Sequence, residues 1–327
     1  MDAGGRIMSG TIGFPPKSSP TASVVVPVFN EESSVEILFQ RLGTVVGQIP
    51  NYQWELVLVD DGSSDRTIEV IEKQRALFPG QVRVVEFSRN FGHQPALLAG
   101  LKESSGALII IIDADLQDPP ELFSTLIAQY ELGNDVVYAV RRTRQESWFK
   151  RSAYTLFYRF MDMMTDIRIP LDSGDFGLVS RRVADLLVEY PDKDLFLRGL
   201  RSWAGFRQTG VEYDRPKRVA GETKYTFSKL LKLAGSGIFG YSSLPLRFST
   251  FLGFLAVVLC VIYGSYAVVG KLVYDNNPPG WTSLVLVVLF LGGVQLISVG
   301  ILGEYIARIY KQLQPRPHYI IKASKSL

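Results

Sequence analysis

The sequence predicts an α/β protein: a sheet of strands that alternate with helices, followed by a helical hairpin that crosses a membrane. Apolar runs rich in β-branched residues alternate with segments of helical spacing over residues 22–140. A polar cluster follows each of the apolar, strand-like runs. Two long stretches without charge lie near the C-terminal end. The length of 327 residues is sufficient for two domains.

The alternating pattern gives five strands and four helices. The expected strands cover 22–28, 54–59, 82–87, 108–112 and 136–140, and the expected helices cover 31–48, 67–77, 95–104 and 122–132. This alternation favours right-handed βαβ units and a parallel sheet. Ligands bind beyond the carboxyl ends of such strands. Polar clusters fall at those ends, at 30–32, 60–61, 89–90, 113–117 and 141–142.

The strand at 108–112 is followed by the most informative of these clusters. Asp113, Asp115 and Gln117 stand at positions i, i+2 and i+4, which point the same way in an extended chain. Three oxygen ligands suit a hard divalent cation that shares its other ligands with a phosphate. The alternative is a plain surface turn, which the following Asp118-Pro119-Pro120 favours.

Other phosphate-binding patterns are absent from the sequence. No Gly-x-Gly-x-x-Gly follows the first strand, and no P-loop pattern is present. The formal net charge of only +3 gives no support for nucleic-acid binding. The single cysteine, Cys260, excludes an internal disulfide and fits a reducing compartment.

Two runs without a charged residue predict the membrane hairpin. They cover about 248–270 and 282–304 of the segment 247–306, apart from Glu304 at the end, and each is long enough to cross a bilayer as a helix. Two buried core helices are the alternative. Basic residues flank the hairpin on both sides, so the positive-inside rule places both ends in the cytoplasm. Residues 307–327 are then a cytoplasmic tail, and residues 1–21 read as a disordered leader.

Two further segments combine aromatic and basic residues. Residues 147–164 read as a helix that packs in the core or meets a lipid surface, and residues 226–246 read as amphipathic interface helices.

Several motifs, taken in order, resemble a known family. Val25-Val26-Pro27-Val28-Phe29-Asn30-Glu31-Glu32, Val59-Asp60-Asp61-Gly62-Ser63, Arg89-Asn90-Phe91-Gly92-His93-Gln94 and Asp113-Ala114-Asp115-Leu116-Gln117 resemble the inverting glycosyltransferases of family 2. Ser173-Gly174-Asp175-Phe176 and Arg218-Val219-Ala220-Gly221-Glu222-Thr223-Lys224 are similar to the polyprenyl-phosphate glycosyltransferases, which include GtrB-type glucosyltransferases and dolichyl-phosphate mannose synthases. The resemblance implies a GT-A fold, a Rossmann-like mixed sheet, over residues 22–225.

The resemblance also implies roles for individual residues. The donor nucleotide sugar would contact Pro27, Phe29, Glu31, Asp60, Asp61, Asp113, Arg218 and Lys224. Asp115 and Gln117, with Asp113 nearby, would hold Mg²⁺ or Mn²⁺. The acceptor phosphate would meet Arg141, Arg142 and Ser173. Asp113, Arg141 and Asp175 would form the catalytic group. Because a phosphate monoester is largely dianionic at neutral pH, it needs no strong base, and Asp175 either orients the site or abstracts a proton.

The expected activity is transfer of one sugar to a polyprenyl phosphate (undecaprenyl or dolichyl) in a bacterial plasma membrane, with the catalytic domain and both termini in the cytoplasm. Glucose from UDP-glucose is the expected donor sugar, and mannose from GDP-mannose is the nearest alternative. A non-catalytic membrane protein that binds nucleotide or lipid is the alternative from another class. Gly292, Gly293, Gly300 and Gly303 permit close helix packing, so we also expect a homo-oligomer, for which a tetramer is one arrangement.

Overall fold

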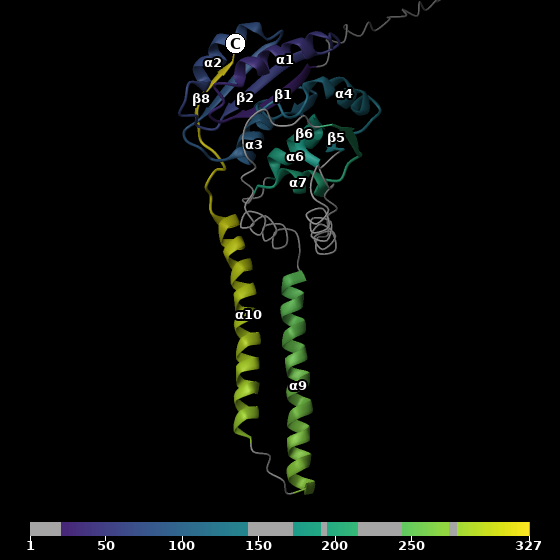
Figure 1. The fold of residues 1–327 in the computed structure, drawn as a ribbon, viewed down its shortest axis with the longest axis vertical. Helices are drawn as coiled ribbons and strands as arrows, with labels where there is room; N and C mark the ends of the chain where they lie inside the picture. Colours follow the sequence, from purple (N-terminus) through teal and green to yellow (C-terminus); the bar gives the residue numbers. More distant parts are fainter. Residues whose placement is uncertain (1–20, 143–172, 191–194, 215–243, 275–279, 327) are drawn as a thin grey trace, which may run out of the picture.

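The computed structural model describes residues 21–142, 173–190, 195–214, 244–274 and 280–326. It shows an α/β head with two long helices that extend away from it (Figure 1). The leader 1–21 apart from Thr21, the helix 147–164, Arg218, Lys224 and nearly all of the segment 226–246 lie outside the described residues.

The head is built on one mixed sheet of eight strands in the order β7-β5-β6-β4-β1-β2-β3-β8. The strands are β1 (Thr21–Val28), β2 (Gln53–Asp60), β3 (Gln81–Phe87), β4 (Leu108–Ile111), β5 (Val136–Arg141), β6 (Ser173–Ser180), β7 (Gln208–Tyr213) and β8 (Ile321–Ser326). Strands β1 to β4 are parallel, as expected. Strand β6 lies between β4 and β5 and is antiparallel to both, so β5 still runs in the direction of β4.

Helices cover both faces of the sheet because its central strands are apolar on both sides. The helices and 3₁₀ turns of the head are α1 (Val35–Gly47), α2 (Thr67–Gln74), η1 (Arg75–Leu77), α3 (His93–Glu103), η2 (Pro120–Leu122), α4 (Phe123–Glu131), α6 (Arg181–Glu189) and α7 (Leu197–Trp203). Val24, Val26 and Val28 of β1 pack with α1, α2 and α4 in one core. Val25 of the same strand packs with α3, α6 and α7 in the other.

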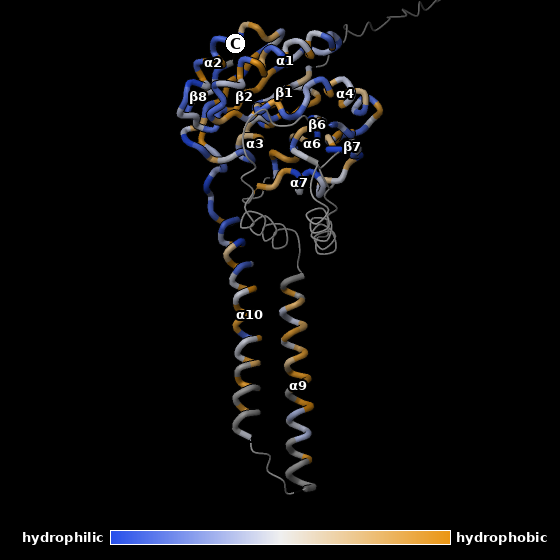
Figure 2. The backbone as a smooth tube through the Cα atoms, in the orientation of Figure 1, coloured by the Kyte–Doolittle hydropathy of each residue, from blue (hydrophilic) through white to orange (hydrophobic). Residues whose placement is uncertain are grey.

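The two long helices are α9 (Leu244–Tyr274) and α10 (Trp281–Leu313). Within them, Phe248–Tyr266 and Phe290–Leu313 are long and apolar enough to cross a membrane. Their apolar side chains face outward, as Phe254 (68% exposed) and Leu296 (75% exposed) illustrate. Figure 2 shows hydrophobic residues along both helices, whereas hydrophilic and hydrophobic residues alternate along the chain of the head. The helices contain the expected spans 248–270 and 282–304 and continue beyond them.

The segment 307–327, expected as a tail, contains secondary structure for which the sequence offers no prediction. Helix α10 continues to Leu313, and Ile321–Ser326 return to the head as strand β8, antiparallel to β3. The short run Ile-Lys-Ala-Ser-Lys-Ser has too little apolar alternation to be read as a strand. Its pairing depends on the open edge of β3, which lies far away in the sequence.

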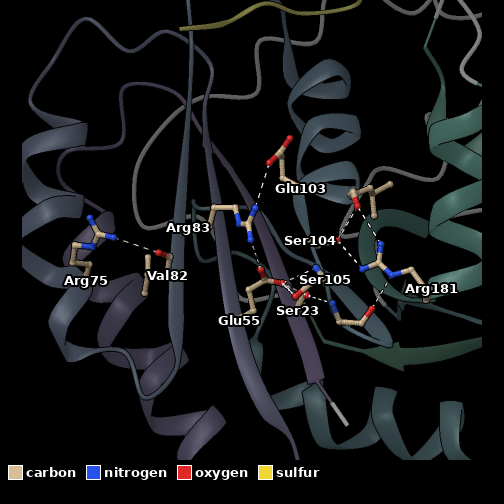
Figure 3. Close-up of polar contacts among 11 residues, drawn as sticks. Ser23, Glu55, Arg75, Val82, Arg83, Glu103, Ser104, Ser105 and Arg181 are labelled. Carbon is tan, nitrogen blue, oxygen red and sulfur yellow. Dashed lines mark hydrogen bonds and ion pairs between the residues drawn. The ribbon is translucent and has the colours of Figure 1, made fainter. Parts of the chain in front are cut away.

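A buried carboxylate ties the strands together at the amino edge of the sheet. Glu55 on β2 is 2% exposed and accepts hydrogen bonds from Ser23 Oγ at 2.6 Å and from the backbone N–H of Ser105 at 2.8 Å (Figure 3). Arg83 Nη2 on β3 lies 3.5 Å from its other oxygen. In the same cluster Arg181 donates to the carbonyl of Gly106 at 2.9 Å. The network therefore joins β1, β2, β3 and the segment before β4 to the start of α6.

We expect Glu55→Ala to lower the free energy of unfolding by about 3 kcal/mol, because the change removes the acceptor of the buried Ser23 hydroxyl and of the Ser105 N–H, and one of the two carboxylates beside Arg83. Urea unfolding in detergent micelles, followed by tryptophan fluorescence, measures this loss.

The matched control is Glu69→Ala, since Glu69 is an exposed carboxylate on α2. It should change stability by less than about 0.5 kcal/mol. Equal losses in the two variants would contradict a special role for the buried network.

Candidate active site

The loops after β1, β2 and β3 bind one another at the carboxyl edge of the sheet. The Asn30 side-chain oxygen accepts a hydrogen bond from the backbone N–H of Ser64 at 2.9 Å, and the N–H of Glu31 donates to Thr67 Oγ1 at 2.8 Å. Asn30 has a φ of 55°, a left-handed conformation that asparagine tolerates better than most residues. The polar loops after β1 and β2, which are distant in sequence, thus form one surface.

Asp61 joins the third loop to this surface. It is 4% exposed, and its two oxygens accept hydrogen bonds from the backbone N–H groups of Phe91 at 2.6 Å and Gly92 at 2.9 Å. Burial raises the pKa of Asp61, although these two N–H groups act in the opposite direction. At Gly62, with φ +73°, a Cβ would lie 2.5 Å from the Arg89 carbonyl carbon, so only glycine allows this approach.

An open pocket lies among these loops and the end of β4. Its lining consists of Pro27, Val28, Phe29, Glu31, Asp61, Asn90, Gly92, His93, Ala96, Asp113, Ala114 and Asp115. The resemblance implies donor contacts for Pro27, Phe29, Glu31, Asp61 and Asp113 and a metal ligand at Asp115, and the structure brings these six residues together here. Asp60 is absent from this lining: it is 3% exposed, and both its oxygens accept the N–H of Ser63. Burial raises the pKa of Asp60.

The chain at Asp113–Gln117 is not extended, so the expectation of three aligned ligands is wrong. Asp115 Oδ1 accepts the backbone N–H of Gln117 at 3.1 Å, which closes a turn, and Leu116 between them has a φ of 56°. The turn buries Gln117, which is 8% exposed, and leaves Asp115 exposed at the pocket. The expectation failed because the side chain of Asp115 binds the backbone two residues on, which competes with extended structure.

The turn at Leu116 is strained, because a left-handed leucine costs on the order of 1–2 kcal/mol. Contacts with neighbouring side chains hold this turn in place. Arg41 binds Glu121 through three hydrogen bonds of 2.7, 2.9 and 3.3 Å, and its Nη1 lies 3.5 Å from the Leu116 carbonyl oxygen. Asp118, which is 1% exposed, accepts a hydrogen bond from the Tyr213 hydroxyl on β7. Strain held in this way is typical of functional sites.

The carboxylates of the pocket fit a divalent cation. Asp113 Oδ1 is buried without a hydrogen-bond partner, and burial together with the nearby Asp175, Asp118 and Asp115 charges raises the pKa of Asp113 to about 6, against the opposing effect of His93. A bound cation would satisfy this oxygen, with Asp115 beside it. No three His, Cys, Asp or Glu side chains form a metal site within the described residues. Phosphate oxygens would therefore have to supply further ligands, as they do for Mg²⁺.

Asp175 lies at this edge because β6 is antiparallel and therefore begins where β4 ends. It is surrounded by donors: Arg198 Nε at 2.9 Å, Gln94 Nε2 at 3.1 Å and His93 Nε2 at 3.3 Å. Burial would raise the pKa of Asp175, but His93 and Arg198 outweigh it and hold that pKa well below its usual range. Both oxygens are engaged, so Asp175 is a poor proton acceptor and a good anchor.

His93 links this anchor to the pocket. Its Nε2 lies 3.3 Å from Asp175 and 3.7 Å from Asp113, and its side chain is 44% exposed. Burial lowers the pKa of His93, but the hydrogen bond to Asp175 and the charge of Asp113 raise it above its ordinary value overall. Neither His93 nor Arg198 is among the site residues expected from the sequence. The position of His93 in the motif after β3 could have indicated that it belongs to the site, whereas no motif contains Arg198.

The basic residues expected at the acceptor separate in the structure. Arg141 Nε lies 3.4 Å from the Tyr213 hydroxyl, and Arg141 Nη2 would lie 3.5 Å from a Cβ on Gly174, so Arg141 stays beside the Ser173–Asp175 segment. Ser173 pairs with Val140 in the β5–β6 ladder. Arg142 instead faces outward, where its side chain is 62% exposed and binds Glu212 at 3.1 Å.

Comparison with known proteins agrees with this arrangement. Residues 23–187 match the family model described as glycosyl transferase family 2, and residues 244–309 match the model described as the GtrB C-terminal hairpin. A Bacillus subtilis protein described as an uncharacterized glycosyltransferase is 45% identical over 92% of this chain and 93% of its own length. The SfII prophage-derived bactoprenol glucosyl transferase of Shigella flexneri is 41% identical over 92% and 97%. The prophage bactoprenol glucosyl transferase homolog of Escherichia coli is 40% identical over 93% and 99%.

The family match covers both the pocket loops and the strand that carries Asp175. The matched hairpin contains the first of the two membrane-length spans and most of the second. The chain therefore belongs to glycosyltransferase family 2.

Proposed function

We propose that this protein transfers one glucose, with inversion, from UDP-glucose to a polyprenyl phosphate in the membrane. The observation that carries the proposal is the combination of an acidic pocket at Asp113 and Asp115 with a membrane-length hairpin in the same chain. The choice of sugar and lipid rests on relatives described as bactoprenol glucosyl transferases, which match over almost their whole length.

The donor would occupy the pocket. Pro27, Phe29 and Glu31, at and after the end of β1, would contact the nucleoside, and Asp61 would hold the loop behind it. Asp60 is buried and would support the donor site indirectly, through the turn that its side chain forms with the Ser63 N–H. Mg²⁺ or Mn²⁺ on Asp113 and Asp115, with Gln117 nearby, would neutralise the diphosphate as it leaves. We place Arg218 and Lys224 on the same diphosphate by resemblance.

The acceptor phosphate would approach from the side of β5 and β6. Arg141 and Ser173 lie together there, and a guanidinium suits a phosphate dianion. Arg142 is at a greater distance and would attract the phosphate by charge alone. The dianion is already a nucleophile, so Asp175 would orient His93 and Arg198 rather than take a proton. Attack opposite the leaving group would give a β-linked product from an α-linked donor.

The hairpin would keep the enzyme at the surface where the lipid phosphate lies. We place the catalytic domain and both termini in the cytoplasm of a bacterial cell, from the basic flanks of the hairpin. We also propose a homo-oligomer, for which a tetramer is one arrangement. The small residues Gly292, Gly293, Gly300 and Gly303 of α10 permit close helix packing, and no atom of a neighbouring described segment lies within 4 Å of the place of their Cβ.

Membranes that contain the protein should form a labelled lipid from UDP-glucose when polyprenyl phosphate and Mg²⁺ or Mn²⁺ are supplied, and EDTA should stop the reaction. Thin-layer chromatography of the extracted lipid measures it. UDP-galactose and GDP-mannose are the matched donors.

Label only from GDP-mannose would overturn the choice of sugar. The absence of labelled lipid from all three donors would overturn the transferase proposal and favour a nucleotide- or lipid-binding role.

Asp115→Ala should reduce transfer by a factor of about 10³ or more, because the diphosphate would lose the charge stabilisation that the metal supplies. Isothermal titration calorimetry should show that Mn²⁺ no longer strengthens UDP binding. Asp185→Ala is the control, since Asp185 is 63% exposed on α6 and far from the pocket in sequence. Unchanged metal dependence in the Asp115 variant would refute this metal site.

Asp175→Asn separates the two roles that its position allows. A general base contributes about 10²–10⁴-fold, whereas an orienting carboxylate with a low pKa should cost only about tenfold and leave the pH profile of kcat in place. Steady-state kinetics from pH 5 to pH 9 measure both quantities. A loss above about 10³-fold together with a flattened profile would identify Asp175 as the base instead.

A further inference from the structure

We propose that Tyr319 is a positioning residue for the donor pocket, acting through Phe87 and Phe91 on the loop 88–93. The inference rests on the proposed function for its kinetic consequences, but its structural part stands separately. Tyr319 belongs to the segment after the membrane-length hairpin, and this segment contains none of the residues expected in the site.

The C-terminal segment is fixed to the end of β3, where this loop begins. Phe87 pairs with Ile321 and Glu86 with Ala323, and the N–H of Ser88 donates to the carbonyl of Ile320 at 2.9 Å. Lys325 lies 3.5 Å from Glu86. The ladder therefore reaches the first residue of the loop.

Three aromatic rings continue the contact into the loop. The Tyr319 ring stacks on Phe87 with centroids 4.9 Å apart and planes within 10°. The other partner of Phe87 is Phe91, which packs edge-on at 5.7 Å. The Arg89 guanidinium lies 4.0 Å from the centre of the Phe91 ring. Tyr319 and Phe91 are both partly buried and pack against the core that α3 covers.

The loop that these rings support is part of the pocket wall. Asn90, Gly92 and His93 line the pocket, and the backbone of Phe91 and Gly92 is held by Asp61. The ring of Phe91 is thus fixed by Phe87 while its backbone is fixed by Asp61. Loss of either contact would free the loop on one side.

Protection of an exposed sheet edge is the simpler explanation for β8 itself. It does not explain the ring of Tyr319, because Tyr319 precedes β8 and is not part of the backbone ladder between β8 and β3. Only Gln314–His318 separate Tyr319 from the end of α10. The support of the donor pocket is therefore continuous with the second membrane-length helix.

The test compares Tyr319→Ala with Tyr319→Phe, which keeps the ring, and with Lys322→Ala, a control on the same segment whose side chain is 68% exposed. Hydrogen–deuterium exchange of the full-length protein in detergent reads the loop directly. In Tyr319→Ala, amides of 88–93 should exchange about tenfold faster while those of β1 stay protected. Both other variants should match the wild type.

Steady-state kinetics give the second reading. Tyr319→Ala should raise the donor KM about tenfold and change kcat and the acceptor KM by less than about threefold, and Tyr319→Phe should restore the donor KM. Unchanged exchange in 88–93 would overturn the inference, as would faster exchange in β1, which would mean general destabilisation. If no donor is transferred, faster exchange in 88–93 alone still supports the role of Tyr319 while the proposed function fails.

Discussion

Two carboxylates, Asp113 and Asp175, face one imidazole at the carboxyl edge of the sheet, and the rest of the site depends on this packing. His93 lies within 3.3 Å of one and 3.7 Å of the other. Like charges so close raise the energy of a site unless donors surround them. Arg198 and Gln94 supply donors to Asp175, whereas Asp113 Oδ1 lies 3.7 Å from His93 Nε2 and accepts no hydrogen bond from the described residues. That asymmetry makes Asp175 the anchor of the pair.

The two edges of the sheet hold their carboxylates in different ways. At the amino edge, Glu55 accepts hydrogen bonds from Ser23 and Ser105, and its other oxygen lies 3.5 Å from Arg83 (Figure 3). At the carboxyl edge, Asp113 keeps an orphaned oxygen and Leu116 holds a strained backbone. Local rules are commonly broken at functional sites, and the stability comes from elsewhere in the fold.

The chain leaves the sheet, forms the membrane-length hairpin and returns to the same sheet. Strand β8 joins β3 after α10, so the head is attached to the hairpin on both sides (Figure 1). A protein that brings a soluble donor to a lipid phosphate needs its pocket at a defined place above the membrane. The return of the chain to the strand that leads into the pocket wall provides such a constraint.

Local pattern by itself determined the strands β1 to β5, the two membrane-length helices and the polar clusters at the carboxyl ends of the strands, because periodicity and hydropathy are local properties. The six expected residues that line the pocket came from the resemblance of the motifs to a known family. The sequence could not give the antiparallel direction of β6, which brings Asp175 to Arg198, or the pairing of β8 with β3. Both depend on contacts between distant segments. At 113–117 the turn, which the sequence offered only as the alternative, prevails over the extended segment, since the hydrogen bond from the Gln117 N–H to Asp115 and the contact with Arg41 together outweigh the extended preference that alternation implied. The sequence thus located the polar clusters at one edge of the sheet, and only the tertiary structure decided which carboxylate is surrounded by donors and which is not.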